Sequence, residues 1–188
     1  MDGRSGRVCP VKRAGSLDNR IRRWLHDPRK ILGPYIGEGM TVLDVGCGPG
    51  LFTIEMAQMV GESGRVIAVD LQEEMLDKLR NKTHGTALAE RIKLHKCEAD
   101  SIGISDKVDF ALAFYMVHEV PNQQEFFEEV QSILKPDGLA LVVEPPLHVS
   151  NRAFEESIGK ARDAGLTPVE RPRVLLSKTI LLKRAPDE

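Results

Sequence analysis

Cysteine is scarce in this sequence, and its scarcity excludes two kinds of small protein. The 188 residues contain three cysteines, Cys9, Cys47 and Cys97, and no two of them are close in the chain. An odd, small number of separated cysteines does not build a disulfide framework, and no cluster of cysteine and histidine has the spacing of a structural zinc site. We therefore expect free thiols in a reducing compartment and no bound metal.

Long apolar runs are missing as well. No segment approaches the roughly 20 apolar residues that a membrane-spanning helix needs, and the N-terminus has no apolar stretch typical of a signal peptide. With 41% hydrophobic and 29% charged residues, the composition is that of an ordinary globular protein. We expect a cytoplasmic protein that does not insert into a membrane and that forms one domain with a substantial core.

Charge is distributed unevenly along the chain. Residues 1–30 contain nine basic and three acidic residues, a net charge of +6, whereas the whole chain has a net charge of −2. A basic arm of this kind can face nucleic acid or an anionic substrate, but a solvated helix face explains the same pattern. Both interpretations stay open at this point.

The first 36 residues are predicted to precede the main domain. Residues 1–16, rich in glycine and charge, read as an irregular leader. Residues 17–36 read as one or two helices, with Trp24 on an apolar stripe and Pro28 suited to the first turn of a new helix. We expect these helices to form a lid over a substrate. The predicted organisation is a leader and helical lid over 1–36 and a single domain over 37–188.

From residue 40 onward, short apolar runs alternate with segments of helical periodicity, which implies a parallel sheet with helices on both faces. The pattern predicts strands at 40–45, 65–69, 92–97, 108–114 and 139–143, and helices at 51–60, 73–82 and 123–134. A turn is predicted at 135–138. A helix at 151–164 follows, and then two strands at about 167–170 and 175–182. Only a short connection separates these last strands, so they should pair antiparallel.

The glycine loop Gly46-Cys47-Gly48-Pro49-Gly50 follows the first predicted strand and opens a helix. Glycines let the backbone turn sharply and let a ligand approach closely, and open α/β sheets bind ligands at the carboxyl ends of their strands. The dinucleotide fingerprint needs glycine at its sixth position, where this chain has Leu51. A carboxylate at Asp44, beside the loop, opposes a pyrophosphate and suits a cation. The loop therefore favours a cationic ligand over a nicotinamide dinucleotide.

An acidic residue followed by Gly-x-Gly-x-Gly resembles the loop of the class I S-adenosylmethionine-dependent methyltransferases, whose cofactor is a sulfonium with an ammonium group and no phosphate. Two further carboxylates match that family. Asp70 ends the second strand, 20 residues past Gly50, where a carboxylate accepts hydrogen bonds from both ribose hydroxyls. Asp100 follows the third strand, where the family's aspartate reaches the adenine amino group. The resemblance covers residues 38–183, and the flanks resemble the UbiE-like or type 11 branch.

This resemblance implies a fold, a cofactor and a set of binding residues. The fold is a Rossmann-like α/β domain, with a seven-stranded, mostly parallel sheet of order 3-2-1-4-5-7-6, an antiparallel last strand and helices on both faces. The cofactor is S-adenosylmethionine, and the product is S-adenosylhomocysteine. The residues expected to bind it are Asp44, Gly46, Cys47, Gly48, Asp70, Leu71, Asp100, Ser101 and Phe114.

The segment after the fourth strand is expected to face the transferred methyl group. His118 has an ordinary pKa near neutrality, which suits a general base, although a histidine packed beside the cofactor fits the same position. Tyr115 can wall an apolar pocket, and Glu144, at the end of the fifth strand, can meet a cationic or hydroxylated substrate. These three residues are the candidate catalytic residues. A base is needed only if the acceptor must lose a proton early.

Missing motifs narrow the acceptor. The Asn/Asp-Pro-Pro-aromatic motif of enzymes that methylate amino nitrogens of nucleic acid is replaced by Phe-Tyr-Met-Val at 114–117. Neither a cysteine nucleophile near the fourth or fifth strand nor the oxygen ligands of a magnesium-dependent enzyme are present. The main hypothesis is transfer to a small-molecule acceptor, with nucleic acid not the expected partner. A protein or nucleic-acid methyltransferase using the basic arm, and a non-catalytic cofactor-binding or interaction module, are the alternatives.

Overall fold

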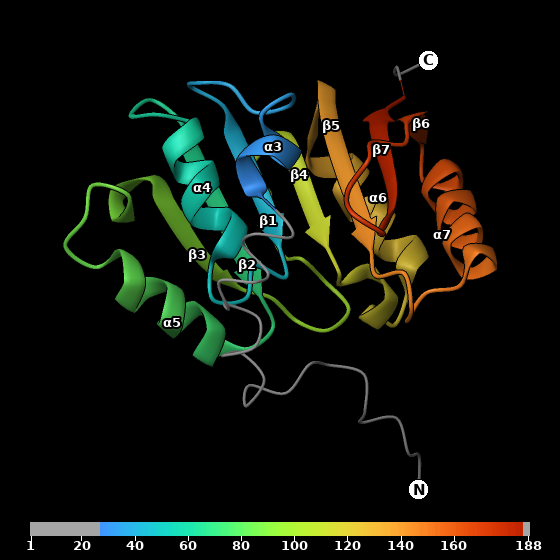
Figure 1. The fold of residues 1–188 in the computed structure, drawn as a ribbon, viewed down its shortest axis with the longest axis horizontal. Coiled ribbons are helices and arrows are strands. Elements are labelled where there is room, and N and C mark those ends of the chain that lie inside the picture. Colours follow the sequence, from blue (N-terminus) through green and yellow to red (C-terminus); the bar gives the residue numbers. More distant parts are fainter. Residues whose placement is uncertain (1–26, 186–188) are drawn as a thin grey trace, which may run out of the picture.

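A seven-stranded sheet in the order β3-β2-β1-β4-β5-β7-β6 forms the centre of the molecule, with helices on both of its faces (Figure 1). The structure is a computed structural model that describes residues 27–185. The predicted fold and strand order are confirmed. Cys9, Trp24 and most of the predicted leader and lid lie outside the described residues.

Strands and helices alternate along the chain as predicted. The strands are β1 (Thr41–Val45), β2 (Arg65–Asp70), β3 (Ile92–Lys96), β4 (Val108–Phe114), β5 (Leu134–Glu144), β6 (Leu166–Glu170) and β7 (Lys178–Arg184). The helices are α3 (Pro28–Leu32), α4 (Leu51–Met59), α5 (Glu73–Thr83), α6 (Gln123–Ile133) and α7 (Asn151–Asp163), with 3-10 turns η2 (Ala89–Arg91) and η3 (Val117–Glu119). β1 to β5 pair parallel, whereas β7 runs antiparallel to β5 and β6. The segments that follow β1 to β5 therefore meet at one edge of the sheet.

Apolar side chains of β1 pack against both faces of the sheet. Val42 belongs to the cluster that includes Phe52 and Met56 of α4, whereas Leu43 belongs to the cluster that includes Phe127 of α6. Successive strand residues point to opposite faces, so a strand covered on both sides is mostly apolar, and in β1 the buried exception is Asp44. Burying each apolar side chain contributes roughly 1.5–3 kcal/mol. This packing fixes the end of β1, and with it the start of the glycine loop.

The described end of the predicted lid packs on the domain. The carboxylate of Asp27 accepts hydrogen bonds from the backbone N–H groups of Arg29 and Lys30, which caps α3. Leu32 is fully buried, and Arg29 Nε donates to Glu55 Oε2 of α4 at 2.9 Å. α3 therefore lies against α4 in one helical layer. The action of residues 17–36 as a lid stays a prediction.

The strand expected at 139–143 begins earlier, at Leu134. Residues 135–138, predicted as a turn, form an irregularity inside the strand, because the pairing register with β4 shifts across them. Lys135 Nζ binds both carboxylate oxygens of Asp109 on β4, at 2.8 and 2.9 Å. The prediction of a turn outside the strand is therefore wrong: these residues lie within β5, because Leu134 already pairs with β4, a tertiary contact that the local sequence does not reveal.

The strand expected at 175–182 begins later, at Lys178. Leu175 and Leu176 belong to a turn, and Leu176 has a φ of 55°, which no strand residue adopts. Both leucines are exposed. The prediction of a strand starting at residue 175 is wrong because it relied on the apolar character of these two residues, and neither side chain is buried in the sheet.

The described helices are short. With 13 residues, α7 is the longest of them. Within residues 27–185, no helix has the length and apolar character needed to cross a membrane. Placement in the cytoplasm stays a prediction.

Candidate active site

The glycine loop between β1 and α4 uses the left-handed backbone region at all three glycines. Gly46, Gly48 and Gly50 have φ values of 71°, 54° and 89°. A Cβ on Gly50 would lie 2.4 Å from Leu79 Cδ1, whereas a Cβ on Gly48 would meet no atom within 4 Å. Gly50 is thus required by its packing against α5. Gly48 faces open space, where a ligand can approach the backbone closely.

Asp70 ties the end of β2 to this loop. Its Oδ2 accepts a hydrogen bond from the backbone N–H of Gly48 at 2.8 Å, and its Oδ1 accepts one from Gln72 at 2.9 Å. Burial raises the pKa of Asp70, while these hydrogen bonds lower it. Each carboxylate oxygen retains capacity for a second hydrogen bond. The side chain can therefore accept from two hydroxyl donors without losing its hold on the loop.

Asp44 is a buried carboxylate. Thr53 Oγ1 donates to its Oδ2 at 2.6 Å, and a backbone hydrogen bond from Thr53 also favours the ionised carboxylate. Burial, with a contribution from the charge of Asp70, raises the pKa of Asp44 to about 7. A bound cation favours the ionised form of such a group. The site therefore fits a ligand that is positively charged and has no phosphate.

Apolar residues line the same edge. Cys47 is buried, and burial raises the pKa of its thiol well above the ordinary value, so the thiol stays neutral and unreactive. Phe114, at the end of β4, packs between Phe52 and Tyr115, with ring centroids 4.4 Å apart in both pairs. Leu71 is partly buried directly after Asp70.

The loop after β3 holds the remaining predicted cofactor residues. Ser101 Oγ donates to Glu129 Oε1 of α6 at 2.6 Å, and the backbone N–H of Ile102 donates to Glu129 Oε2 at 2.5 Å. Glu129 thus fixes this loop. Sequence reasoning missed this residue, because its charge gave no signal beyond a polar helix face. Asp100 is exposed, and its contact with adenine stays a prediction.

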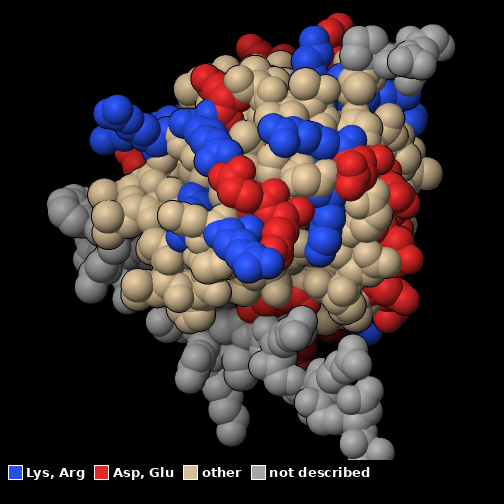
Figure 2. Space-filling view, turned by 90° about the vertical axis from the view of Figure 1, so that its right-hand side faces the viewer, with Lys and Arg blue, Asp and Glu red and all other residues tan. Residues whose placement is uncertain are grey.

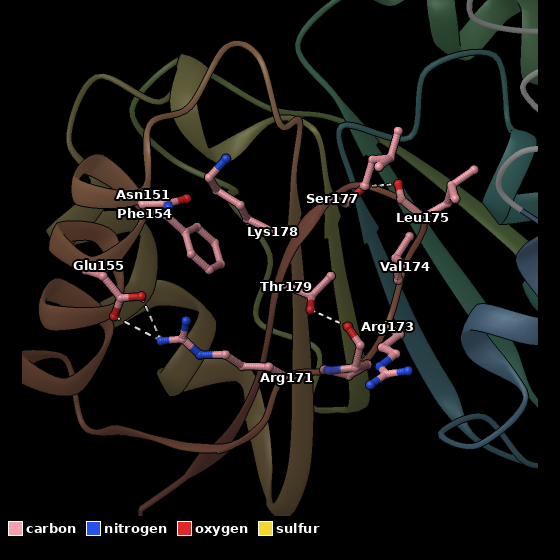
Figure 3. A pocket seen from close by; sticks show the side chains of 12 residues that line it. Asn151, Phe154, Glu155, Arg171, Arg173, Val174, Leu175, Ser177, Lys178 and Thr179 are labelled. Atoms are coloured by element: carbon pink, nitrogen blue, oxygen red, sulfur yellow. Dashed lines mark hydrogen bonds and ion pairs between the residues drawn. The ribbon is translucent and has the colours of Figure 1, made fainter.

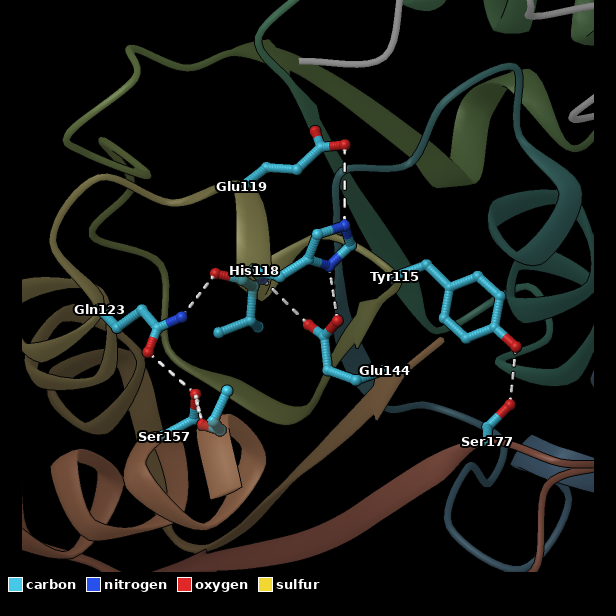
Figure 4. Close-up of polar contacts among 9 residues, drawn as sticks. Tyr115, His118, Glu119, Gln123, Glu144, Ser157 and Ser177 are labelled. Carbon is cyan, nitrogen blue, oxygen red and sulfur yellow. Dashed lines mark hydrogen bonds and ion pairs between the residues drawn. The ribbon is translucent and has the colours of Figure 1, made fainter. Parts of the chain in front are cut away.

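His118 and Glu144 come together at the carboxyl ends of β4 and β5 (Figure 4). The buried Glu144 accepts the backbone N–H of His118 at 3.1 Å through Oε1, and its Oε2 lies 2.5 Å from His118 Nδ1. This bond raises the pKa of His118 against the opposing effect of burial. A carboxylate partner places the proton on Nδ1, so Nε2 of the neutral ring is an acceptor. Glu119 Oε1 lies 3.9 Å from Nε2.

Tyr115 adopts a strained backbone conformation beside this pair. Its φ of 60° lies in the left-handed region, which for an aromatic residue costs about 1–3 kcal/mol. The backbone N–H donates to Val143 O at 2.8 Å, and the hydroxyl lies 2.6 Å from Ser177 Oγ (Figure 4). These two hydrogen bonds hold the strained residue and tie β4 to the segment before β7.

The glycine loop and the segment after β4 are neighbours. A Cβ on Gly46 would lie 3.1 Å from Met116 Cβ, two residues before His118. The structure therefore brings the predicted catalytic residues Tyr115, His118 and Glu144 to the same sheet edge as the loop. Across residues 27–185, no group of three or more His, Cys, Asp or Glu side chains could hold a metal ion.

Known proteins match this arrangement. A family model described as a methyltransferase domain matches residues 36–164. The demethylmenaquinone methyltransferase of Lactobacillus johnsonii is 34% identical over 107 residues, which is 56% of this chain and 44% of that protein. The ubiquinone/menaquinone biosynthesis C-methyltransferase UbiE of Klebsiella pneumoniae is 27% identical over 130 residues, 69% of this chain and 50% of that protein. The chain thus spans about half the length of these curated relatives.

A solved structure extends the match to nearly the whole chain. The S-adenosylmethionine-dependent methyltransferase of Aquifex aeolicus has a TM-score of 0.81 and 29% identity, and the match covers 93% of this chain and 97% of that one. The sheet order, the glycine loop and the carboxylates beside it define a Rossmann-like domain that binds S-adenosylmethionine. The chain belongs to the class I S-adenosylmethionine-dependent methyltransferases, in the UbiE-like branch.

Proposed function

We propose that the protein transfers the methyl group of S-adenosylmethionine to a small-molecule acceptor, with His118 as general base. The observation that carries the proposal is the hydrogen bond between His118 Nδ1 and the buried Glu144, at the sheet edge that holds the glycine loop. When bound, the cofactor supplies an electrophilic methyl carbon attached to a good leaving group. The chain must then orient the acceptor and remove its proton, and orientation alone can supply roughly 7–11 kcal/mol.

Cofactor binding is assigned to the residues around the glycine loop. Asp70 would accept hydrogen bonds from ribose hydroxyls, and the ionised form of Asp44 would favour the cationic part of the cofactor. Asp100 and Ser101 would meet the adenine. The walls would be formed by Gly46, Cys47, Gly48, Leu71 and Phe114. The open space at Gly48 and the burial of the Asp44 carboxylate beside the loop support this assignment.

His118 would remove the proton of the methyl acceptor through its Nε2 atom. Glu144 orients the ring through Nδ1 and stabilises the imidazolium that forms, which is the role of a buried carboxylate behind a catalytic histidine. Tyr115 would line the pocket for the methyl acceptor, because its ring lies between Phe114 and Ser177. The step balances because the sulfur–methyl bond would break with its electron pair staying on sulfur, as S-adenosylhomocysteine, while the substrate gains the methyl group and loses its proton to His118.

A hydroxylated aromatic ring of the quinol type is the acceptor class that we propose first. The relative from Lactobacillus johnsonii is named a demethylmenaquinone methyltransferase, and that from Klebsiella pneumoniae a C-methyltransferase of ubiquinone/menaquinone biosynthesis. A ring hydroxyl carries a proton that a histidine can remove, and its loss enriches the ring in electrons, as methylation at carbon or oxygen requires. The first 36 residues are proposed as the leader and lid over this acceptor.

The experiment compares two histidine variants. The protein is incubated with S-adenosylmethionine and a panel of reduced benzoquinones and naphthoquinones, and formation of S-adenosylhomocysteine is followed. His118→Asn should lower the rate at least roughly 100-fold, the usual contribution of a general base. His148→Asn is the matched control, because its ring lies 6.4 Å from that of His118 and the side chain is exposed. Equal activity of the two variants would contradict the assignment of the base.

A further inference from the structure

A groove opens at the β6 edge of the sheet, between α7 and residues 171–177 (Figure 3). It exists because β6 pairs with β7 only from Leu181 onward, whereas β7 begins at Lys178. The first residues of β7 therefore have no neighbouring strand on their outer side. The groove encloses about 640 Å³, a volume typical of small-molecule sites.

The lining of this groove has an excess of positive charge. Arg171, Arg173 and Lys178 line it, and the single carboxylate among its lining residues is Glu155. Arg171 Nη2 engages both oxygens of Glu155, at 2.8 and 2.9 Å. No carboxylate of the described residues forms an ion pair with Arg173 or Lys178. The groove therefore holds two cationic side chains without an anionic partner.

These cations are local to the groove. Figure 2, which views this side of the molecule, shows basic and acidic side chains intermingled over the face, with no uniform basic surface. Lys178 Nζ donates to Pro146 O at 3.1 Å, which leaves two of its three N–H donors for a ligand. The first turn of α7, next to Lys178 in Figure 3, contains no acidic residue that would repel an anion.

The inner end of the groove touches the candidate active site. Lys178 of β7 lies directly opposite Glu144 of β5 in the antiparallel pairing, a position where Cα atoms are about 4.5–5.5 Å apart. Ser177, which also lines the groove, contacts the hydroxyl of Tyr115 at 2.6 Å. Glu144 also binds His118, so Lys178 is the strand partner of the residue that holds the proposed base.

Each wall of the groove also contributes an apolar side chain. The ring of Phe154 points from α7 toward β7 (Figure 3), and the buried Val174 belongs to the facing segment. A ligand that fits this lining has an apolar body and an anionic group. A neutral polar ligand would leave the two free cations without a partner.

We propose that this groove binds an anionic group of the methyl acceptor, a carboxylate or a phosphate, through Lys178 and Arg173. The inference rests on the proposed function, because the groove adjoins Tyr115 through Ser177 and Glu144 through Lys178. It narrows the acceptor to amphiphilic molecules that carry a negative charge beside the ring that is methylated. The anion positions the ring and takes no part in the transfer.

The test uses probes that differ only in charge. Binding of 4-pentylbenzoate, 4-pentylphenyl phosphate and neutral 4-pentylbenzyl alcohol is measured by NMR titration of the full chain in the presence of S-adenosylhomocysteine. The anions should bind at least about tenfold more tightly than the alcohol. Arg173→Gln and Lys178→Gln should each weaken anion binding about tenfold and leave alcohol binding unchanged. Lys183→Gln is the matched control, because Lys183 lies at the far end of β7, paired with Asp137 at 3.0 Å.

Several results would overturn the proposal. The first is equal affinity of the protein for the alcohol and the anions. The second is unchanged anion affinity in Arg173→Gln and Lys178→Gln, and the third is an equal loss of anion affinity in Lys183→Gln. Leu147 and Leu176 are 93% and 80% exposed nearby, so binding to vesicles of anionic lipid is measured too. If Arg173→Gln and Lys178→Gln lose vesicle binding but bind 4-pentylbenzoate as the wild type does, the two cations bind a lipid surface and the proposal is wrong. Binding of S-adenosylhomocysteine is measured separately for every variant. If the protein does not bind this compound, the proposed function is contradicted, whereas the measured affinity of the groove for anions still stands.

Discussion

Glu144 holds His118 at two points, because one carboxylate accepts both the backbone N–H and the ring Nδ1. The two residues are 26 positions apart and lie at the ends of neighbouring strands. Since the carboxylate is buried and the ring is partly exposed, the pair leaves Nε2 on the exposed side of the ring, 3.9 Å from Glu119 Oε1. The contact therefore fixes both the orientation and the basicity of His118.

This contact predicts the pH dependence of methyl transfer. His118 accepts a proton only when neutral, and Glu144 raises its pKa, so kcat/KM should rise with pH and level off only above the ordinary histidine pKa of about 6.5. Glu144→Gln removes the negative charge and should move the inflection to lower pH, with a lower plateau. A pH–rate profile of both proteins checks this. An unchanged inflection in the variant would show that His118 is not the titrating group.

Cofactor affinity should also depend on pH, through Asp44. Its pKa of about 7 leaves it largely protonated below neutrality, whereas a cationic ligand favours the ionised form. Affinity for S-adenosylmethionine should therefore rise as pH increases through about 7, with release of up to one proton. Calorimetry in buffers of different ionisation enthalpy measures that proton. Asp44→Asn should abolish the dependence, and the exposed Asp137→Asn should keep it; proton release that persists in Asp44→Asn would point to another group.

Gly50 of the loop and Gly85, which follows α5, allow the effect of backbone strain on stability to be measured separately from that of side-chain packing. Gly50 and Gly85 both have positive φ values, 89° and 73°, but only a Cβ at Gly50 would overlap another residue, Leu79. Gly85→Ala should cost about 1–2 kcal/mol of unfolding free energy from strain alone. Gly50→Ala should cost a further roughly 1–3 kcal/mol, because the buried Leu79 cannot move away freely. Urea unfolding measures both, and equal losses would mean that Leu79 accommodates the added methyl group.

The sheet and the loop could be predicted because their signals are local. β1 is buried on both faces, so its apolar run stands out, and the glycines follow it directly. The order of the strands came from the family resemblance, since periodicity alone does not say which strands are neighbours. Asp70 was recognisable for the same reason, because it ends a strand at a fixed distance from the loop.

The contacts between distant residues could not be predicted. The sequence places His118 and Glu144 after neighbouring strands, but their hydrogen bond depends on the register of β4 against β5 and on the turn η3. The apolar pair Leu175 and Leu176 was interpreted as strand, although both residues are exposed in a turn. The groove beside them results from the early end of β6, and sequence periodicity carries no signal for it.

The central claim is that the glycine loop and Asp70 bind S-adenosylmethionine, and calorimetric titration with this compound and with S-adenosylhomocysteine tests it most directly. Asp70→Ala is compared with Asp77→Ala, an exposed aspartate on the following helix. We expect micromolar binding, about −8 kcal/mol, weakened at least roughly tenfold by Asp70→Ala and unchanged by Asp77→Ala. Melting curves confirm that each variant is folded. Absence of binding by the folded wild-type chain, or equal binding by all three proteins, would contradict the account.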